Sequence, residues 1–270
     1  MSTESVNERS RNIDKMTTLE MVKVINEEDK TVAERIEEAL PSIAAAVDAI
    51  AERLKRGGRL IYIGAGTSGR IAIQDAAECT VTYGVPRGTV RAIMAGGDGA
   101  VFFPSENVED LYERGVSDIA DANVAENDCL MGISASGGAN YVVGALDEAK
   151  RRGALTVSMI CNEHGKITEH SDLAISVPTG AEVISGSTRM KAGTAQKMVL
   201  NIISTSVMIK LGKVSGNFMT WMTPTNAKLV KRAHFIISEV CSISKEDAAK
   251  LLEENGNNIQ SAINAYREGK

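Results

Sequence analysis

The chain has few aromatic residues and no excess of basic residues. Aromatic side chains make up 4% of its 270 residues, and 30 Lys and Arg stand against 35 Asp and Glu, a net charge of -5. Such a charge repels nucleic acid phosphates and anionic lipid head groups, so we expect neither as a partner. The single tryptophan, Trp221, is expected in the core or a subunit contact rather than in a stacking platform.

Cysteine and long apolar runs are also scarce. A chain of this length needs no disulfides, and the N-terminus lacks the apolar stretch of a signal peptide. The apolar run over residues 198–211 is interrupted by Asn201 and Lys210, so it does not predict a membrane span. We expect a cytoplasmic protein with four reduced cysteines and no CxxC pair: Cys79, Cys129, Cys161 and Cys241.

The hydrophobic pattern predicts an α/β fold. Apolar residues recur every three or four positions from Thr18 to about Arg56, which indicates helix. Short apolar runs then alternate with helical stretches, which predicts a parallel sheet covered on both faces, a doubly wound sheet of the flavodoxin type. The expected strands are 59–63, 90–95, 129–133, 154–161 and 173–177, and the expected helices include 70–79, 106–122, a helix ending near 152 and another ending near 211.

The pattern also suggests three parts. Residues 1–56 form an N-terminal helical segment, 57–238 the α/β domain, and 239–270 a small helical subdomain of the UBA-like kind. In the last part Ser244 is placed as a helix N-cap, with Asp247 three residues later, and Asn255-Gly256 ends that helix.

Hydroxyl side chains lie among glycines after two of the expected strands. Thr67 and Ser68 follow the first strand, and Ser134 and Ser136 follow another. Ligands of open parallel sheets bind at the carboxyl ends of the strands, where helix N-terminal amides point at an anion. Serine and threonine also cap helices without any ligand. Two such loops together favour a phosphate site.

Other cofactor sites have weaker support. Gly64-x-Gly66-x-x-Gly69 matches the dinucleotide fingerprint, but the next strand does not end in the acid that binds ribose, and no Walker loop is present. Cys161, His164 and His170 have CxxH-like spacing without an evident fourth ligand, so we expect no metal site.

Two carboxylates are candidates for proton transfer. Glu78 lies in the mostly apolar stretch Ala76 to Tyr83, where we expect partial burial to raise its pKa. Glu109 is expected on the helix after the second strand. Most glutamates are solvated surface residues, so the residue types alone leave that ordinary reading open.

Three segments resemble the bacterial N-acetylmuramic acid 6-phosphate etherases. They are GRLIYIGAGTSGR from Gly58, DAAEC from Asp75, and GAEVISGSTRMKAGTAQKMVLN from Gly180. These enzymes belong to the sugar isomerase (SIS) fold group, which includes the mammalian glucokinase regulatory protein. The similarity extends over nearly the whole chain, so residues 57–238 are expected to be an SIS phosphosugar-binding domain.

The resemblance implies an activity and a site. Family members cleave the lactyl ether of N-acetylmuramic acid 6-phosphate without metal or redox cofactor. Glu78 would be the acid that assists departure of lactate, and Glu109 the base that removes the C2 proton. Family members are dimers whose site is completed near the subunit interface. The phosphorylated amino sugar would be held by Gly66, Thr67, Ser68, Ser134, Ser136 and Gly137, with Glu182, Ser187 and Lys191 as further contacts.

The sequence departs from the family beside these loops. Thr80-Val81-Thr82 stands where the etherases usually have Pro-Pro-Thr, and Gly138-Ala139-Asn140 where they usually have Arg-Thr-Pro. Losing an Arg and a Thr removes a charge and a hydroxyl donor from the expected pocket. Two alternatives therefore stand beside the etherase: a non-catalytic phosphosugar-binding regulator and an aldose-ketose phosphosugar isomerase.

Overall fold

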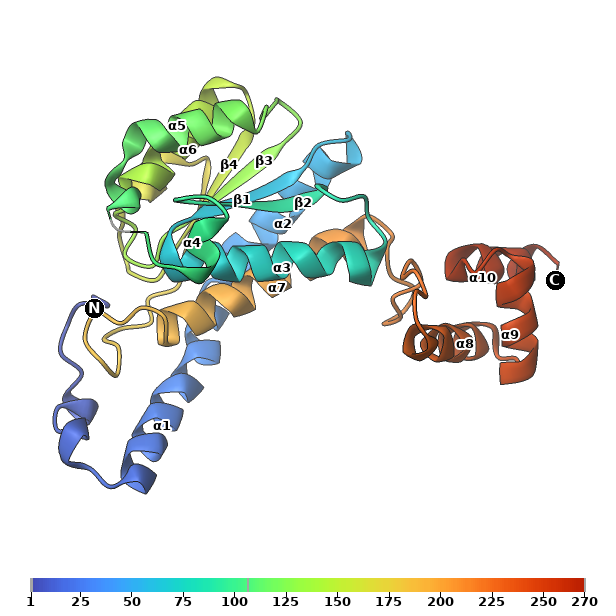
Figure 1. Cartoon of the computed structure of the whole chain (residues 1–270), viewed down its shortest axis with the longest axis horizontal. Coiled ribbons are helices and arrows are strands. Elements are labelled where there is room, and N and C mark those ends of the chain that lie inside the picture. The colour runs from blue at the N-terminus through green and yellow to red at the C-terminus, as the bar shows by residue number, and fades with distance from the viewer. Residues whose placement is uncertain (1, 106, 270) are drawn as a thin grey trace. The chain divides into compact units, whose positions relative to one another are not determined.

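A computed structural model describes residues 2–105 and 107–269. The chain forms two compact units. One consists of residues 1–76 and 88–207, and the other of residues 77–87 and 208–270. Figure 1 labels their helices and strands. The three-part division expected from the sequence, with boundaries after residues 56 and 238, stays a prediction.

The first unit is built around a five-stranded parallel sheet of order β2-β1-β3-β4-β5. This is the flavodoxin-type order, in which the chain changes direction of winding between β1 and β3. The expected α/β fold is confirmed, and each expected strand is found within two residues of its expected ends. The strands are β1 (Leu60–Gly64), β2 (Val90–Met94), β3 (Cys129–Ile133), β4 (Leu155–Ile160) and β5 (Leu173–Ser176).

Helices cover both faces of this sheet (Figure 1). α6 packs on β1, β3 and β4 with α5 beside it, and α2 packs on β4 and β5. α3 and α7 begin in this unit. The helices are α1 (Thr18–Glu37), α2 (Leu40–Lys55), α3 (Gly66–Tyr83), α4 (Gly99–Phe102), α5 (Tyr112–Asp121), α6 (Asn140–Arg151) and α7 (Lys191–Lys210), with 3-10 helices η1 (Glu8–Ser10), η2 (Ile13–Lys15), η3 (Val108–Asp110) and η4 (Lys166–His170).

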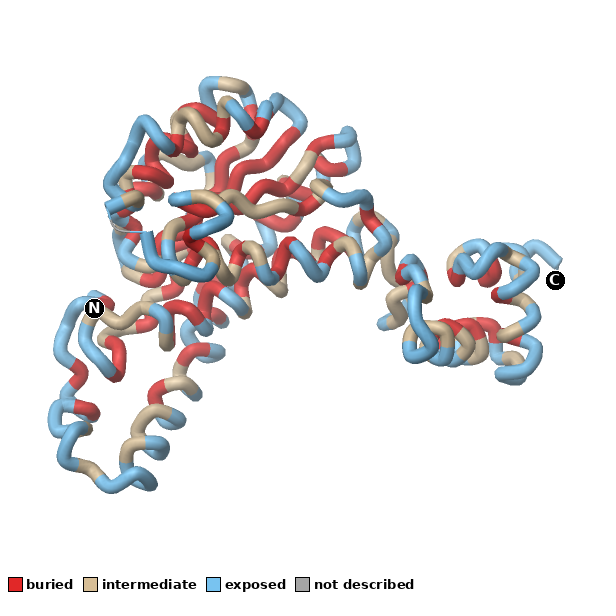
Figure 2. The backbone as a smooth tube through the Cα atoms, viewed as in Figure 1, coloured by how far each residue is buried: buried red, intermediate tan, exposed pale blue. Residues whose placement is uncertain are grey.

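The core follows from the alternation of side chains along each strand. Ile61, Ile63 and Leu130 are fully buried and belong to the apolar cluster under α5 and α6. Tyr62 points to the other face, where its hydroxyl donates to Asp75 of α3 at 2.9 Å. Figure 2 shows the strands at the centre of this sheet as buried, and β1, β3 and β4 are buried almost throughout, whereas the edge strands β2 and β5 are only partly buried. A strand buried on both faces explains the continuous apolar runs in the sequence.

Two expected helices differ from those observed. The helical stretch from Thr18 to Arg56 is two helices, because α1 ends at Glu37 and α2 begins at Leu40, with Pro41 in its first turn where proline is tolerated. The helix expected over 106–122 is instead η3 followed by α5. Glu106 lies outside the described residues.

In the second unit, α8 (Ala227–Cys241), α9 (Lys245–Glu254) and α10 (Ile259–Glu268) enclose a small apolar core that includes Ile237, Leu252 and Ile263. The expected start of α9 is confirmed, because the Ser244 hydroxyl accepts from the Asp247 amide at 3.0 Å. Among the described helices of both units, none has the length and apolar character that a bilayer crossing requires.

A buried carboxylate joins the starts of β1 and β3. Asp128 accepts from the Arg59 guanidinium at 2.6 and 3.1 Å, from the Arg59 amide at 2.8 Å and from the Ala125 amide at 3.0 Å. Burial opposes ionisation of Asp128, but the hydrogen bonds from Arg59 and Ala125 outweigh it and lower its pKa.

We expect Asp128→Asn to lower the free energy of unfolding by about 2 kcal/mol at pH 7, because charge-assisted hydrogen bonds are lost. A lowered folded-state pKa stabilises the fold above the unfolded pKa, near 4, and this stabilisation disappears as pH falls through the folded pKa. Urea unfolding of both proteins at several pH values measures the penalty. A penalty that does not shrink below about pH 4 would contradict the ionised role of Asp128.

Candidate functional site

Two loops leave the carboxyl ends of the neighbouring strands β1 and β3, where the winding of the sheet reverses. The first loop is very short, since α3 begins only two residues after β1 ends. A Cβ on Gly69 would lie 2.8 Å from the Gly64 carbonyl oxygen, so a glycine is needed for α3 to approach β1 this closely. This packing holds Thr67 and Ser68 at the end of the sheet.

The second loop orders its own hydroxyls. The Ser134 hydroxyl accepts from the Gly137 amide at 3.1 Å, and the Ser136 hydroxyl accepts from the Gly138 amide at 3.2 Å. Each hydroxyl uses an acceptor lone pair in this way and keeps its O–H donor for another group. Neither serine caps α6, whose N-cap is Ala139 without a side-chain bond, so these bonds order the loop and leave both hydroxyl donors for binding.

The two loops enclose a cavity of about 260 Å³. No Lys or Arg lines it in the part of the chain that the structure describes, so an anion here would be held by hydroxyls and by backbone amides at helix starts. The cavity brings together Glu109 and five of the six expected phosphosugar-loop residues. It is lined by Glu4, Ala65, Gly66, Thr67, Ser68, Glu109, Ile133, Ser134, Ala135, Ser136, Ala139, Gly186 and Thr188.

Glu109 reaches the cavity from η3, not from the long helix expected there. Asn107, just before η3, has a left-handed backbone with φ of 58°, a conformation that Asn adopts more readily than most residues. Glu109 also lines an adjoining hollow of about 350 Å³ that shares Gly66. Among the described residues, the Glu109 carboxylate accepts no hydrogen bond, so it is available to a ligand.

Glu78 does not line this cavity. It follows Gly66 along α3 by about 18 Å at 1.5 Å per residue, and its side chain is exposed. The expectation that Glu78 is partly buried is therefore wrong for the single chain. The reason is the position of Glu78 around the helix. The buried face of α3 carries Ala72, Asp75 and Cys79, and Glu78 lies outside that face.

The buried carboxylate of this helix is Asp75. It accepts from the Tyr62 hydroxyl at 2.9 Å, from Asn201 Nδ2 at 2.6 Å and from the Ser204 hydroxyl at 3.0 Å. These bonds join α3 to β1 and to α7. Asp75 therefore fixes the helix that carries the first loop.

Two expected ligand contacts in the Gly180 segment have partners within the fold, and their ligand role stays a prediction. Glu182 is fully buried and accepts from the amides of Lys191 and Ala192 at 3.0 and 2.9 Å, which caps α7. Burial raises the pKa of Glu182 despite these amides. The Lys191 ammonium is buried against Glu28 at 2.6 Å. Neither side chain lines the cavity.

The remaining two expected contacts, Gly137 and Ser187, lie next to the cavity lining. Gly137 shapes the second loop with φ of 79°, and Ser187 lies half-buried between two residues that do line the cavity, Gly186 and Thr188. Thr188 and Glu4 also line the cavity, and neither is among the site residues expected from the sequence. A threonine in the glycine-rich stretch after Gly180 is a signal that could have indicated Thr188, whereas nothing in the N-terminal sequence marks Glu4.

The residues considered for metal binding have other partners. The buried Cys161 thiol donates to the Ala192 carbonyl at 3.6 Å, and burial raises its pKa. His170 Nδ1 lies 2.7 Å from Asp147 Oδ1. Within residues 2–105 and 107–269, the structure contains no group of three or more His, Cys, Asp or Glu arranged to hold a metal ion.

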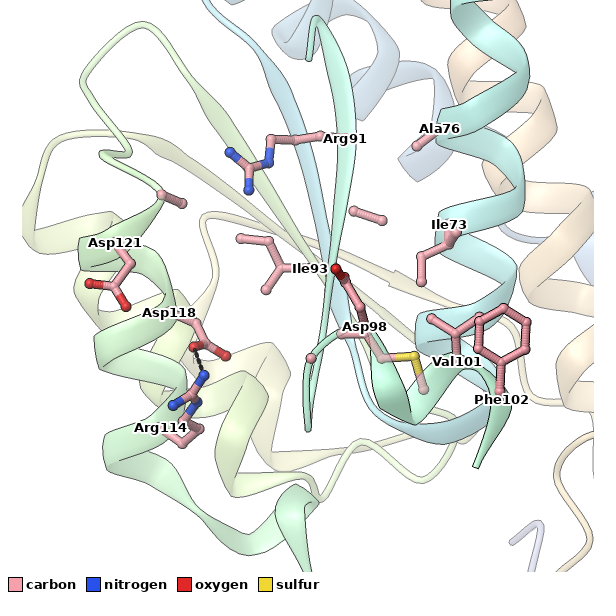
Figure 3. A pocket seen from close by; sticks show the side chains of 14 residues that line it. Ile73, Ala76, Arg91, Ile93, Asp98, Val101, Phe102, Arg114, Asp118 and Asp121 are labelled. Carbon is pink, nitrogen blue, oxygen red and sulfur yellow. Dashed lines mark ion pairs between the residues drawn. The ribbon is translucent and has the colours of Figure 1, made fainter. Parts of the chain in front are cut away.

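A larger cavity of about 620 Å³ lies beside the edge strand β2 (Figure 3). Its walls carry aliphatic side chains such as Ile73 and Ile93, and its Arg114 and Asp118 pair with each other at 2.9 Å. It contains neither of the hydroxyl-bearing loops. The smaller cavity at the ends of β1 and β3 is therefore the candidate active site.

Comparison with known protein families gives two matches. Residues 42–150 match the glucokinase regulatory protein N-terminal SIS domain, and residues 106–206 match the SIS domain. Together they span the sheet and both loops of the candidate site.

Solved structures share the fold. A phosphoheptose isomerase from Francisella tularensis has a TM-score of 0.57 and 20% identity, covering 72% of this chain and 100% of its own. The phosphoheptose isomerase GmhA from Neisseria gonorrhoeae has a TM-score of 0.56 and 20% identity, covering 71% of this chain and 98% of its own. At this identity the similarity shows the fold alone.

Curated relatives are much closer in sequence. The N-acetylmuramic acid 6-phosphate etherase of Clostridium beijerinckii is 51% identical over 97% of this chain and 86% of its own length. The etherase of Caldanaerobacter subterraneus is 49% identical over 97% of this chain and 85% of its own length. With this identity along almost its whole length, the chain belongs to the N-acetylmuramic acid 6-phosphate etherase family.

Proposed function

We propose that this protein cleaves the lactyl ether of N-acetylmuramic acid 6-phosphate with water, giving N-acetylglucosamine 6-phosphate and D-lactate. The observation that carries the proposal is the shared cavity, where the Glu109 carboxylate faces the hydroxyl-bearing loops after β1 and β3. A phosphate held by those loops places the attached sugar within the same small space. The membership of the etherase family supports this substrate.

Glu109 is the base in this proposal. In the open-chain sugar the aldehyde makes the C2 proton acidic, and Glu109 removes it. The C3–O bond to lactate then breaks, which leaves an unsaturated aldehyde; this elimination is a carbon–oxygen lyase step. Water then adds at C3 and completes the reaction. These steps exchange only protons, lactate and water, so they require no redox cofactor.

The phosphate group supplies binding energy away from the reacting carbons. Hydroxyls of Thr67, Ser68, Ser134 and Ser136 donate to it together with the amides of the two loops. Anchoring the phosphate holds C2 and C3 near the Glu109 carboxylate and lowers the entropic cost of reaction. Ala139 lines the cavity at the position where the etherases usually have Thr, so one hydroxyl donor fewer is present here.

The acid that protonates the departing lactate comes from outside this cavity. We assign it to Glu78, whose exposed carboxylate lies on α3 near Val81, an apolar side chain that is 56% exposed. An exposed apolar residue beside a functional carboxylate fits a surface covered by a second subunit. The protein is then a cytoplasmic homodimer in which Glu78 of the partner subunit completes each site.

The same reaction distinguishes the etherase from the two alternative functions, the phosphosugar isomerase and the non-catalytic regulator. A phosphosugar isomerase exchanges the C2 proton but releases no lactate, and a non-catalytic regulator does neither. The isomerase fold neighbours support only the architecture, and the family supports the etherase. Lactate release therefore separates the three.

We expect Glu109→Gln to reduce lactate release from N-acetylmuramic acid 6-phosphate by about 10² to 10⁴-fold, because the base is lost. Asp110→Asn is the matched control, since Asp110 is the next residue of η3 and does not line the cavity. Steady-state lactate assays at pH 7 compare the three proteins. Full activity of Glu109→Gln, or equal losses in both variants, would remove Glu109 from the mechanism.

The subunit arrangement has a separate test. Glu78→Gln and Glu109→Gln are each expected to be inactive as homodimers. A mixed dimer purified through two different tags has one site with both carboxylates intact if Glu78 acts across the interface, so it should regain about half of the wild-type activity. A mixed dimer as inactive as its parents would place both carboxylates of a site on one chain, and an active Glu78→Gln homodimer would exclude Glu78 as the acid.

A further inference from the structure

Residues 2–10 pass beside the candidate site and contribute Glu4 to its lining; we call this segment the strap. Asn7 Nδ2 donates to the Ala181 carbonyl at 3.2 Å, and the Ser10 hydroxyl donates to the Val183 carbonyl at 2.7 Å. Both acceptors belong to the segment that carries the cavity residues Gly186 and Thr188. The strap is therefore held along the Gly180 segment by specific bonds.

The beginning of the strap is joined to the second loop through one side chain. Asn162 Oδ1 accepts from the Thr3 amide at 3.0 Å, and Asn162 Nδ2 donates to the Ser136 carbonyl at 3.2 Å. Thr3 is fully buried. Asn162 thus ties the position of the strap to the loop that carries Ser134 and Ser136.

These anchors place Glu4 in the wall of the cavity. A Cβ added at Gly186, where φ is 75°, would lie 2.9 Å from Glu4 Oε2, so the carboxylate lies directly against the Gly180 segment. Only a residue without a side chain leaves that space. Among the described residues, the Glu4 carboxylate accepts no hydrogen bond, although the strap around it is firmly attached.

The chemistry of the cavity limits what Glu4 can bind. Among the described residues, Glu4 and Glu109 are the carboxylates that line it, and the other polar groups are hydroxyls and amides. A carboxylate accepts from O–H and N–H donors and repels anions. The phosphate therefore belongs with the loop donors, and the hydroxyl and amide groups of the sugar are the donors left for Glu4.

We propose that Glu4 is a specificity-determining residue of the site, whose carboxylate accepts hydrogen bonds from hydroxyl or amide N–H groups of the sugar while the loops hold the phosphate. This inference rests on the proposed phosphosugar substrate. Because the strap fixes it through Thr3 and Asn7, Glu4 meets the sugar in one orientation. It adds a substrate contact from the N-terminal segment to those of the sheet.

Removing the charge of Glu4 is expected to change the affinities for two ligands differently. Replacing it with Gln removes repulsion of the phosphate, so the affinity for inorganic phosphate should stay the same or rise by a few fold. The same change weakens a charge-assisted hydrogen bond to the sugar, so the affinity for N-acetylglucosamine 6-phosphate should fall by about tenfold. A strap that only supported the loops would change both affinities in the same direction.

Titration calorimetry of full-length wild type and Glu4→Gln with both ligands tests this. Glu8→Gln is the control, because Glu8 lies on the same strap but pairs with Arg11 at its surface; it should change neither affinity by more than about twofold. Far-UV circular dichroism and thermal melting of each variant confirm that it is folded.

Three results would overturn the inference: unchanged binding of N-acetylglucosamine 6-phosphate by Glu4→Gln, equal weakening of both ligands, or a wild type for which the sugar adds no affinity over phosphate. Lactate release by the wild type is measured independently. Loss of sugar affinity in Glu4→Gln without lactate release would support Glu4 and reject the etherase reaction.

Discussion

The site depends on the contact between β1 and β3 at the centre of a parallel sheet. Gly64 pairs with Ile133 across this contact, and the two following loops open side by side because the winding of the chain reverses there. The close approach of Gly69 to Gly64 then brings α3 down onto the end of β1. Amide and hydroxyl donors from segments far apart in sequence converge on one small cavity as a result.

The charges of the residues that line this cavity limit which of them can bind a phosphate. Within the described part of the chain, no basic side chain lines it, and the Lys191 ammonium forms an ion pair with Glu28 in the interior. In the proposed function, donors that carry no formal charge hold the phosphate, while the Glu109 carboxylate takes the proton from C2. Glu182, which resembles a ligand contact in the sequence, instead satisfies the first amides of α7 and so supports Gly186 and Thr188.

Much of the fold and part of the site could be predicted from the sequence. The five strands follow from apolar runs such as Leu60 to Ile63, and Thr67, Ser68, Ser134 and Ser136 follow from their places after strands. Periodicity could not separate α1 from α2, since both halves of the stretch repeat at helical spacing. The burial of Glu78 could not be predicted, because apolar neighbours in the sequence do not show which face of a helix a residue occupies. On α3 the buried acidic residue is Asp75.

The sequence by itself determined the family, the sheet and the two hydroxyl-bearing loops, because these depend on local propensity and on motifs within single segments. Only the tertiary structure showed that Glu4 lines the cavity, that Glu78 does not, and how Glu109 reaches it. Glu109 enters through a short 3-10 turn after Asn107, and Glu4 enters because Asn162 and the Gly180 segment hold a strap from the other end of the chain. Contacts between residues separated by more than a hundred positions leave no periodic signal in a single sequence, so packing alone reveals them.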